Sequence, residues 1–230
     1  MSEKVNPPRR YDSSRRRAQA AQTRQDILSA AREQFLRRGF TGTTLAGIAS
    51  AAGVVVETVY RSFDGKAGLF RAVVEDAVAD GGTLGGAAPP DSARLRPEFD
   101  AIIAETDPRR RLELYADTQR GVQARIGPLM RVLAEASAAD PVVQKTSERL
   151  QAQRLDGMDR FARLLAERDA LRAGLTVEEA RDVLWALNSH AVYDLLVVNR
   201  GWDPERYGDW LADTLARLLL REEDPRDDRP

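Results

Sequence analysis

The segment that decides the fold is TTLAGIASAAGVVVETVYRSFDGK, residues 43–66. Two short helical stretches flank a glycine in it, which is the pattern of a helix-turn-helix. This motif needs a small residue where its helices cross, a residue that tolerates positive φ in the turn, and an apolar residue that holds the second helix down. Ala49, Gly53 and Val59 meet these needs in that order. The segment therefore predicts a helix-turn-helix at about residues 44–63.

Helical patterning continues on both sides of this motif. Residues 17–38 place apolar side chains on one face, and Gly39 supplies a C-terminal stop. Asp64 and Gly65 open a further helix, and the glycine- and proline-rich residues 81–90 are expected to form a loop.

The remainder of the chain repeats one helix-start signal, an Asp-Pro pair. Asp accepts hydrogen bonds from the free N–H groups at a helix start, and proline at the first helical position gives up only a donor that has no partner there. The pairs are Asp107-Pro108, Asp140-Pro141 and Asp203-Pro204. Thr176 and Glu179 add a capping box, so one helix is expected over residues 176–200 and another over residues 204–220. The predicted fold class is all-α, with nine or ten helices and no sheet.

The composition of the 230 residues excludes several classes of protein. There is no cysteine, which rules out disulfide scaffolds, thiolate metal sites and cysteine nucleophiles. No apolar run approaches the roughly 18 residues of a membrane span, and the polar, arginine-rich start lacks the apolar centre of a secretory signal. Hydrophobic residues make up 43% of the chain, which is too many for a disordered protein. A soluble, cytoplasmic protein without membrane association is expected.

The net charge of −1 conceals an uneven distribution. Residues 1–75 carry 13 basic and 7 acidic residues, whereas the remaining 155 carry 22 basic and 29 acidic residues. A basic end on an otherwise acidic chain favours a polyanionic partner for that end. The alternative is a solvated, flexible basic tail.

Residues 24–69 carry a pattern of 21 positions whose gaps are all in register. They are Arg24, Ile27, Leu28, Ala30, Ala31, Phe35, Gly39, Phe40, Thr43, Thr44, Ile48, Ala49, Ala52, Gly53, Val54, Thr58, Val59, Tyr60, Phe63, Lys66 and Leu69. This segment resembles the opening of regulators of the TetR/AcrR family. The resemblance continues more weakly in a closing pattern of Trp185, Tyr193, Leu195, Leu196, Arg200, Gly201, Trp202, Trp210 and Leu211.

The resemblance implies a three-helix, N-terminal helix-turn-helix DNA-binding domain, followed by a helical C-terminal domain that binds a ligand and dimerises. On this basis we expect a flexible basic arm at residues 1–17 and a DNA-binding domain at residues 18–66. A ligand-binding and dimerisation domain then covers residues 67–221, and residues 222–230 form a disordered tail.

The resemblance also implies that the second helix of the motif enters the major groove of double-stranded operator DNA. Thr44, Tyr60 and Lys66 match positions that touch phosphates, and their side chains all donate to phosphate oxygens. Base contacts would fall to Val55, Val56, Glu57, Thr58 and Arg61, through thymine methyl groups and a cytosine amine. Two alternatives stay open for Arg15, Arg16, Arg17 and Arg24, which are contact with the flanking minor groove and disorder.

Three positions depart from the family pattern. Leu45 stands where some members use a polar or basic base contact, Val55 where serine is frequent, and Gly65 where a Ser or Asn cap is usual. Few hydrogen-bonding groups remain to read bases, so we hypothesise that backbone and DNA-shape contacts carry much of the specificity.

In the C-terminal domain the resemblance implies a small-molecule effector and a homodimer. Candidate pocket residues, which alternatively form plain core, are Phe99, Tyr115, Met130, Met158, Phe161, Trp185 and Asn188. Candidate dimer-interface residues, which alternatively close the monomer core, are Leu184, Leu187, Ala191, Leu195, Trp210, Leu211, Leu215 and Leu218.

The predicted function is a transcriptional repressor that binds a palindromic operator as a homodimer and is released by a small apolar molecule. The alternatives are an architectural DNA-binding protein without an effector and an enzyme with a basic patch. No catalytic residue, metal or cofactor is expected. His190 with Asp194 makes a poor metal site, because zinc takes three or four protein ligands.

Overall fold

The computed structural model describes residues 13–81, 96–167 and 169–221. Contacts divide the chain into two compact units, residues 1–70 (unit 1) and residues 71–230 (unit 2). Within the described residues the regular structure is entirely helical, apart from an isolated bridge between Leu171 and Leu220. The all-α prediction is confirmed. The loop was predicted over residues 81–90, but Gly81 is the last residue of α4 (Gly65–Gly81). Residues 82–90, the predicted tail at 222–230 and the first 12 residues of the predicted arm lie outside the described residues.

Unit 1 contains α1 (Ser13–Gly42), α2 (Leu45–Ala51), α3 (Val56–Phe63) and the start of α4 (Gly65–Gly81). The last turn of α1 is interrupted at Gly39, whose φ of 67° confirms it as a stop. Because α1 begins at Ser13, residues 15–17 are helical, and the prediction that they belong to a flexible arm is wrong.

The core of unit 1 surrounds an aromatic cluster of Phe35, Phe40 and Phe70. The Phe35 and Phe70 rings meet edge to face with centroids 4.7 Å apart, and Phe40 lies 5.4 Å from Phe70. All three residues of the motif behave as predicted, since Ala49 and Val59 are buried and Gly53 has a φ of 65°. Unit 1 therefore presents α2 and α3 on a closely packed base.

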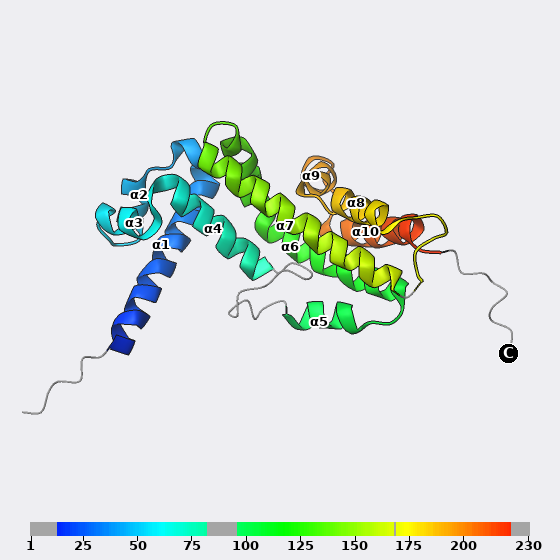
Figure 1. Ribbon diagram of the computed structural model, residues 1–230. Coiled ribbons are helices and arrows are strands. Elements are labelled where there is room, and N and C mark those ends of the chain that lie inside the picture. Colours follow the sequence, from blue (N-terminus) through cyan, green and yellow to red (C-terminus); the bar gives the residue numbers. More distant parts are fainter. Residues whose placement is uncertain (1–12, 82–95, 168, 222–230) are drawn as a thin grey trace, which may run out of the picture. The chain divides into compact units, whose positions relative to one another are not determined.

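The helices of unit 2 pack around the long pair α6 and α7, which run side by side (Figure 1). Helix α10 packs on α6, and α8 packs on α7 and α10. In chain order they are α5 (Arg96–Ala104), α6 (Pro108–Ser137), α7 (Pro141–Ala166), α8 (Val177–Leu187), α9 (His190–Tyr193), the π-helix η1 (Asp194–Asn199) and α10 (Pro204–Leu219). None of the described helices is both long enough and apolar enough to cross a membrane.

The predicted helix starts of unit 2 are confirmed. Asp107, Asp140 and Asp203 each accept a hydrogen bond from a backbone N–H of the helix that follows. At α8, Thr176 and Glu179 form both halves of the capping box. These local signals depend only on neighbouring residues, which is why the sequence shows them.

The helix predicted over residues 176–200 is not continuous. Helix α8 ends at Leu187, Ser189 is extended with a ψ of 150°, and its side chain accepts from the N–H of Val192 to start α9. Asn and Ser side chains compete with the helix for backbone partners, so the Asn188-Ser189 pair favours this break. A π-helix then replaces α-helix over Asp194–Asn199.

A fully buried arginine joins three helices of unit 2. Arg111 of α6 donates through Nε to the carbonyl of Ile102 at 3.0 Å and through Nη1 to that of Leu164 at 3.4 Å. It also binds the carbonyl of Glu105. The guanidinium thus satisfies backbone groups near the C-terminal ends of α5 and α7, where a positive charge is favoured.

Candidate nucleic-acid interface and effector region

Helix α3 has one buried face and one exposed face. Val59 and Phe63 point into unit 1 and are almost completely buried. On the opposite side Glu57, Tyr60 and Arg61 are exposed, and these three lie within about a third of the helix circumference. The structure therefore brings an acceptor, a phenol and a guanidinium to one accessible surface.

Val55 and Tyr60 are the most exposed large apolar residues of unit 1. Val55 is 65% exposed just before α3, and Tyr60 is 58% exposed on the helix itself. Of the other predicted base contacts, Val56 and Thr58 are half-buried beside them. An exposed valine has no stabilising role in a monomer, but its methyl groups can meet thymine methyls in a major groove.

Thr44 keeps a free proton while it caps α2. Its Oγ1 accepts from the N–H of Gly47 at 3.1 Å, and its backbone is extended, as expected for an N-cap. The hydroxyl proton is not needed for this bond and can be donated to a phosphate. The local geometry is thus compatible with the predicted contact.

Lys66 has a structural role that sequence reasoning missed. Its ammonium donates to the carbonyls of Phe40 at 2.9 Å and Thr43 at 3.2 Å, and it lies 4.5 Å from the Phe40 ring centroid. Two of its three protons therefore fix the turn that precedes Thr44. Its phosphate contact stays a prediction, with one proton left to make it.

The four arginines of α1 that are predicted to contact DNA are exposed. Arg24 stacks its guanidinium 4.4 Å from the Phe63 ring centroid, which places a positive charge at the end of α3. Residues 15–17 are exposed on the first turns of α1. Their minor-groove contact remains a prediction.

Five of the seven predicted pocket residues lie in the core of unit 2. The Tyr115 and Phe161 ring centroids lie 4.8 Å apart, the Tyr115 hydroxyl is 3.4 Å from Met158 Sδ, and Asn188 Nδ2 donates to that hydroxyl. Phe99 belongs to the same cluster of buried residues. Met130 is half-buried, and Trp185 is 36% exposed, so neither is a core residue.

A buried polar network extends from this cluster. Gln123 of α6 donates to the side-chain and backbone oxygens of Asn188, each at 3.2 Å, and its own carbonyl oxygen pairs with Nδ1 of His190. Arg154 of α7 donates to the carbonyls of Trp185 at 2.7 Å and Asn188 at 3.4 Å. The network thus connects α6 and α7 to the break between α8 and α9.

Burial shifts the ionisation of this network. It raises the pKa of the Tyr115 and Tyr207 phenols well above their usual range, while Arg154 partly offsets the shift. Burial and the nearby charge of Arg154 lower the pKa of His190 to about 4. At neutral pH both phenols are therefore protonated and the imidazole is neutral. Among the described residues, no three His, Asp or Glu side chains are placed to share a metal ion.

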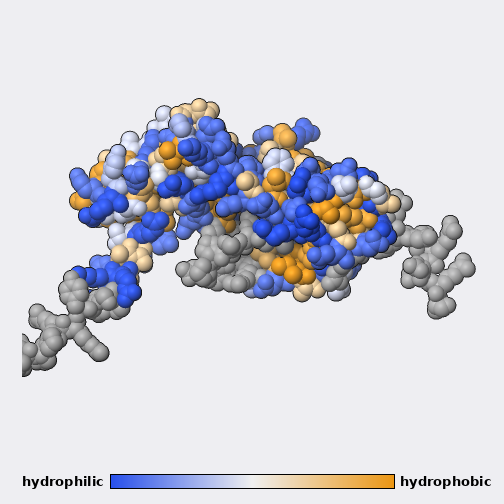
Figure 2. Space-filling model, in the orientation of Figure 1, coloured by the Kyte–Doolittle hydropathy of each residue, from blue (hydrophilic) through white to orange (hydrophobic). Residues whose placement is uncertain are grey.

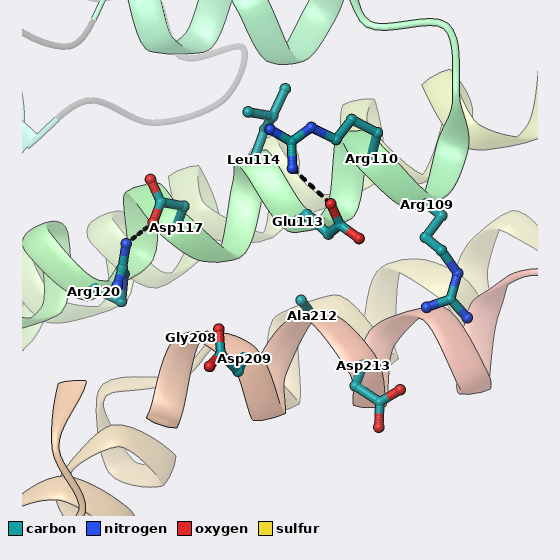
Figure 3. A pocket seen from close by; sticks show the side chains of 10 residues that line it. All are labelled: Arg109, Arg110, Glu113, Leu114, Asp117, Arg120, Gly208, Asp209, Ala212 and Asp213. Carbon is teal, nitrogen blue, oxygen red and sulfur yellow. Dashed lines mark hydrogen bonds and ion pairs between the residues drawn. The ribbon is translucent and has the colours of Figure 1, made fainter. Parts of the chain in front are cut away.

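A groove of about 460 Å³ lies elsewhere on unit 2, between α6 and α10 (Figure 3). Charges of both signs line it, and two of its ion pairs, Arg110 with Glu113 and Arg120 with Asp117, lie along α6. Its lining residues are Arg109, Arg110, Glu113, Leu114, Asp117, Arg120, Gly208, Asp209, Ala212 and Asp213. None of the predicted pocket residues is among them.

The predicted dimer-interface residues fall into two groups. Leu184, Leu211 and Leu215 are completely buried in the core of unit 2, so they close the monomer core and have no surface for a partner. For these three the interface prediction is wrong. Ala191, Leu195 and Leu218 are exposed, while Leu187 and Trp210 are half-buried. Figure 2 shows apolar residues at the surface over α8 and α10.

The fold and the α3 surface define a class, the helix-turn-helix proteins with a separate helical C-terminal region. Residues 27–73 match the family described as "Bacterial regulatory proteins, tetR family". The match covers α2, α3 and parts of α1 and α4.

Relatives extend the likeness beyond the motif. The chain is 28% identical over 210 residues to the HTH-type transcriptional repressor BepR of Brucella suis biovar 1 (strain 1330), covering 89% of this chain and 95% of that protein. It superposes with a TM-score of 0.65 on NalD, the secondary repressor of the MexAB-OprM multidrug efflux pump in Pseudomonas aeruginosa, at 27% identity over 88% of this chain and 99% of NalD. A complex of SmeT with triclosan shares the fold, with a TM-score of 0.65 at 20% identity over 90% of this chain and 98% of SmeT.

Proposed function

We propose that this protein is a transcriptional repressor that binds a palindromic operator as a homodimer and is released by a small, largely apolar molecule. The observation that carries the proposal is the exposed face of α3, with Glu57, Tyr60 and Arg61 on a helix that Val59 and Phe63 anchor. A buried anchor and an exposed polar face are what a recognition helix needs in order to enter a major groove as a rigid body.

The distribution of charge supports DNA as the partner. Most of the excess positive charge lies on the segment that carries α1 to α3, and the rest of the chain is acidic. Arg24 and Arg61 lie at the end and on the exposed face of α3 respectively, whereas Lys66 steadies the turn before α2. Such an arrangement attracts the DNA backbone to one surface and repels it from the other.

The experiment is selection of binding sites from random duplex DNA, followed by affinity measurements on the selected operator. We expect a palindromic site, because a two-fold dimer reads two half-sites. Tyr60→Phe removes one phosphate donor and should weaken binding about three- to tenfold. Arg163→Gln, which removes an exposed charge on α7, is the control and should leave operator affinity unchanged. Failure to enrich any sequence would contradict the proposal.

Dimerisation is proposed through the exposed apolar residues of the last helices. Leu195 and Val198 on η1 are more than half exposed, and Leu218 of α10 and Trp185 of α8 are each 36% exposed. Sedimentation should give twice the mass of one chain, 25.5 kDa. Leu195→Lys should shift the population toward monomer and lower operator affinity, and a monomeric wild-type protein that binds a palindrome would refute this part.

The effector is proposed to bind in the core of unit 2 near Tyr115, Met158, Phe161 and Asn188. These residues are apolar or hydrogen-bonded and come from α6, α7 and the α8–α9 break. A ligand there acts by binding one arrangement of the helices more tightly than another. A fold neighbour, SmeT, has been captured with triclosan, which supports a small molecule in this fold. The competing function, an architectural protein without effector, predicts operator affinity that no small molecule changes.

A further inference from the structure

The core of unit 2 contains an unsatisfied phenol. Tyr207 of α10 is completely buried, and among the described residues its hydroxyl oxygen has no hydrogen-bond partner. Its ring packs on Tyr193 and Trp210, with centroids 4.9 Å and 6.0 Å away. Native cores seldom leave such a group unsatisfied, because the hydroxyl has lost its water and gained nothing in return.

The neighbouring phenol is also short of an acceptor. The Tyr115 hydroxyl receives a hydrogen bond from Asn188, and its own proton points only to the thioether of Met158 at 3.4 Å. A thioether is a weak acceptor. Burial raises the pKa of both phenols, so each keeps a proton to donate at neutral pH.

The third group of the cluster is the guanidinium of Arg154, which pairs with no carboxylate among the described residues. Arg154 is half-buried, stacks on the Trp185 ring with 4.6 Å to the centroid, and donates to two carbonyls at the end of α8. Those carbonyls explain its position but bear no full negative charge. Arg154 donates to the carbonyl of Asn188, whose side chain donates to the Tyr115 hydroxyl, and Tyr115 and Tyr207 belong to the same cluster of buried residues. The cluster therefore has a surplus of donors and one uncompensated positive charge.

The backbone beside this cluster is irregular. Asn188 occupies the break after α8, and Tyr193, against which Tyr207 packs, is the last residue before η1. Single π-turns are rare and occur frequently at functional sites. A break followed by a π-helix is held by fewer regular backbone bonds than a continuous helix, so it can move aside when a molecule enters.

We propose that the effector of this protein is a small organic anion, an apolar molecule with a carboxylate that accepts hydrogen bonds from Tyr207, Tyr115 and Arg154. The inference rests on the proposed effector site and names its ligand class. A carboxylate supplies the acceptors and the negative charge that the cluster lacks. The apolar body would lie among Met158, Phe161 and the leucines of the surrounding core.

The same three side chains, Tyr207, Tyr115 and Arg154, disfavour cationic and neutral effectors. A cationic ligand would face the like charge of Arg154 at close range in a poorly solvated site. A neutral hydrocarbon would leave the protons of Tyr207 and Tyr115 unpaired. The site should therefore bind an anion most tightly, a neutral hydrogen-bond acceptor less tightly and a cation most weakly.

The test uses three probes of the same shape, 3-phenylpropanoate, 3-phenylpropanamide and 3-phenylpropylamine, titrated calorimetrically into the full-length protein. We expect the carboxylate to bind at least about tenfold more tightly than the amide, and the amine most weakly. Tyr207→Phe should lower carboxylate affinity about fivefold without lowering the melting temperature of the free protein. If the Tyr207 hydroxyl were purely structural, Tyr207→Phe would lower the melting temperature and leave carboxylate affinity unchanged.

Charge at position 154 is tested with matched variants. Arg154→Gln should abolish the preference for carboxylate over amide, whereas Arg154→Lys should retain it. Arg163→Gln is the control, because it removes the same charge from an exposed ion pair on the same helix. Thermal unfolding verifies that each variant is folded. If Arg154→Gln does not fold, the affinities of Arg154→Lys for the carboxylate and the amide still test the role of the charge.

Three results would overturn the inference. They are equal affinity for the carboxylate and the amide, a carboxylate affinity that Arg154→Gln leaves unchanged, and no binding of any probe up to millimolar concentration. The proposed function fails separately. If the carboxylate binds as expected but does not release operator DNA, the ligand class stands and its regulatory role is wrong.

Discussion

The two units differ in what they bury. Among the described residues of unit 1, Thr43 is the one buried polar side chain, and its hydroxyl donates to the carbonyl of Gly39 at 2.8 Å. The described part of unit 2 buries an arginine, an asparagine, two glutamines and a threonine, together with three tyrosines. An apolar core fixes one arrangement of helices, whereas polar groups inside a core can exchange partners. The first suits a rigid reading surface, and the second suits a site that responds to a ligand.

The charges follow the same division. The segment that carries the reading helix has an excess of basic residues, and the remainder has an excess of acidic residues. The net charge of the whole chain, −1, hides both. In a protein whose two units have different functions, net charge is informative only when it is counted for each unit separately.

The largest effect is expected in the core of unit 1. Phe35→Ala removes a ring that contacts both Phe40 and Phe70, and should cost about 3–5 kcal/mol of stability. Chemical unfolding measures the loss, and operator binding should disappear with it. Leu36→Ala, at a neighbouring position that is 40% exposed, is the control and should cost less than about 1 kcal/mol. Equal costs for the two variants would mean that the aromatic cluster does not hold unit 1 together.

The corresponding test in unit 2 is Arg111→Met. The methionine replaces the aliphatic stem but leaves the carbonyls of Ile102, Glu105 and Leu164 without their donor, which should cost about 3 kcal/mol in chemical unfolding. Arg110→Met removes the same charge from an exposed pair with Glu113 and should leave stability nearly unchanged. If Arg111→Met lost no more stability than Arg110→Met, the hydrogen bonds of the buried guanidinium would not be what holds these helices of unit 2 together.

His190 should make stability depend on pH. Its pKa in the folded protein, about 4, lies below its ordinary value of 6.5, so the unfolded chain binds the proton first. Stability is therefore complete above about pH 6.5 and falls as the pH drops toward 4, by up to ~1.4 kcal/mol per pH unit. The variant His190→Asn keeps a hydrogen-bond donor for Gln123 but has no side chain that titrates in this range.

The measurement is the difference between wild type and His190→Asn in thermal unfolding from pH 4 to 7.5. The groups that face the imidazole are Gln123 and the guanidinium of Arg154. Arg154 stays charged throughout this range, so the difference reports His190. Parallel curves would show that the imidazole is not buried in neutral form.

The smallest effect is expected at the start of α2. Thr44→Ala deletes the cap that accepts from Gly47 and should cost about 1 kcal/mol of stability, together with a severalfold loss of operator affinity. Thr44→Ser keeps the hydroxyl and should retain both. An operator affinity that follows stability alone would remove Thr44 from the DNA interface.

The sequence predicted unit 1 better than unit 2, for a physical reason. In the helix-turn-helix, Ala49, Gly53 and Val59 each meet a steric demand set by residues a few positions away, and the Asp-Pro helix starts are equally local. The network of unit 2 joins Gln123 to Asn188 and Tyr115 to Met158, pairs separated by 65 and 43 positions. Helical periodicity gives the buried face of each helix but not the partner on another helix.

Three features of the structure show the same limit. Leu184, Leu211 and Leu215 have the spacing of an interface stripe, yet that stripe packs inside the monomer, because periodicity does not distinguish one apolar contact from another. The break at Asn188 and Ser189 was overlooked because the apolar spacing continues through it. Lys66 fitted a phosphate contact by position, and its bonds to two carbonyls are visible only in three dimensions.

The most direct test of the central claim is hydrogen–deuterium exchange of the full-length protein with its selected operator and with a scrambled duplex of equal length. We expect peptides that cover residues 44–63 to exchange more slowly with the operator than with the scrambled duplex. Unchanged exchange in those peptides, or protection found only in residues 71–230, would contradict the claim that α3 of unit 1 reads DNA.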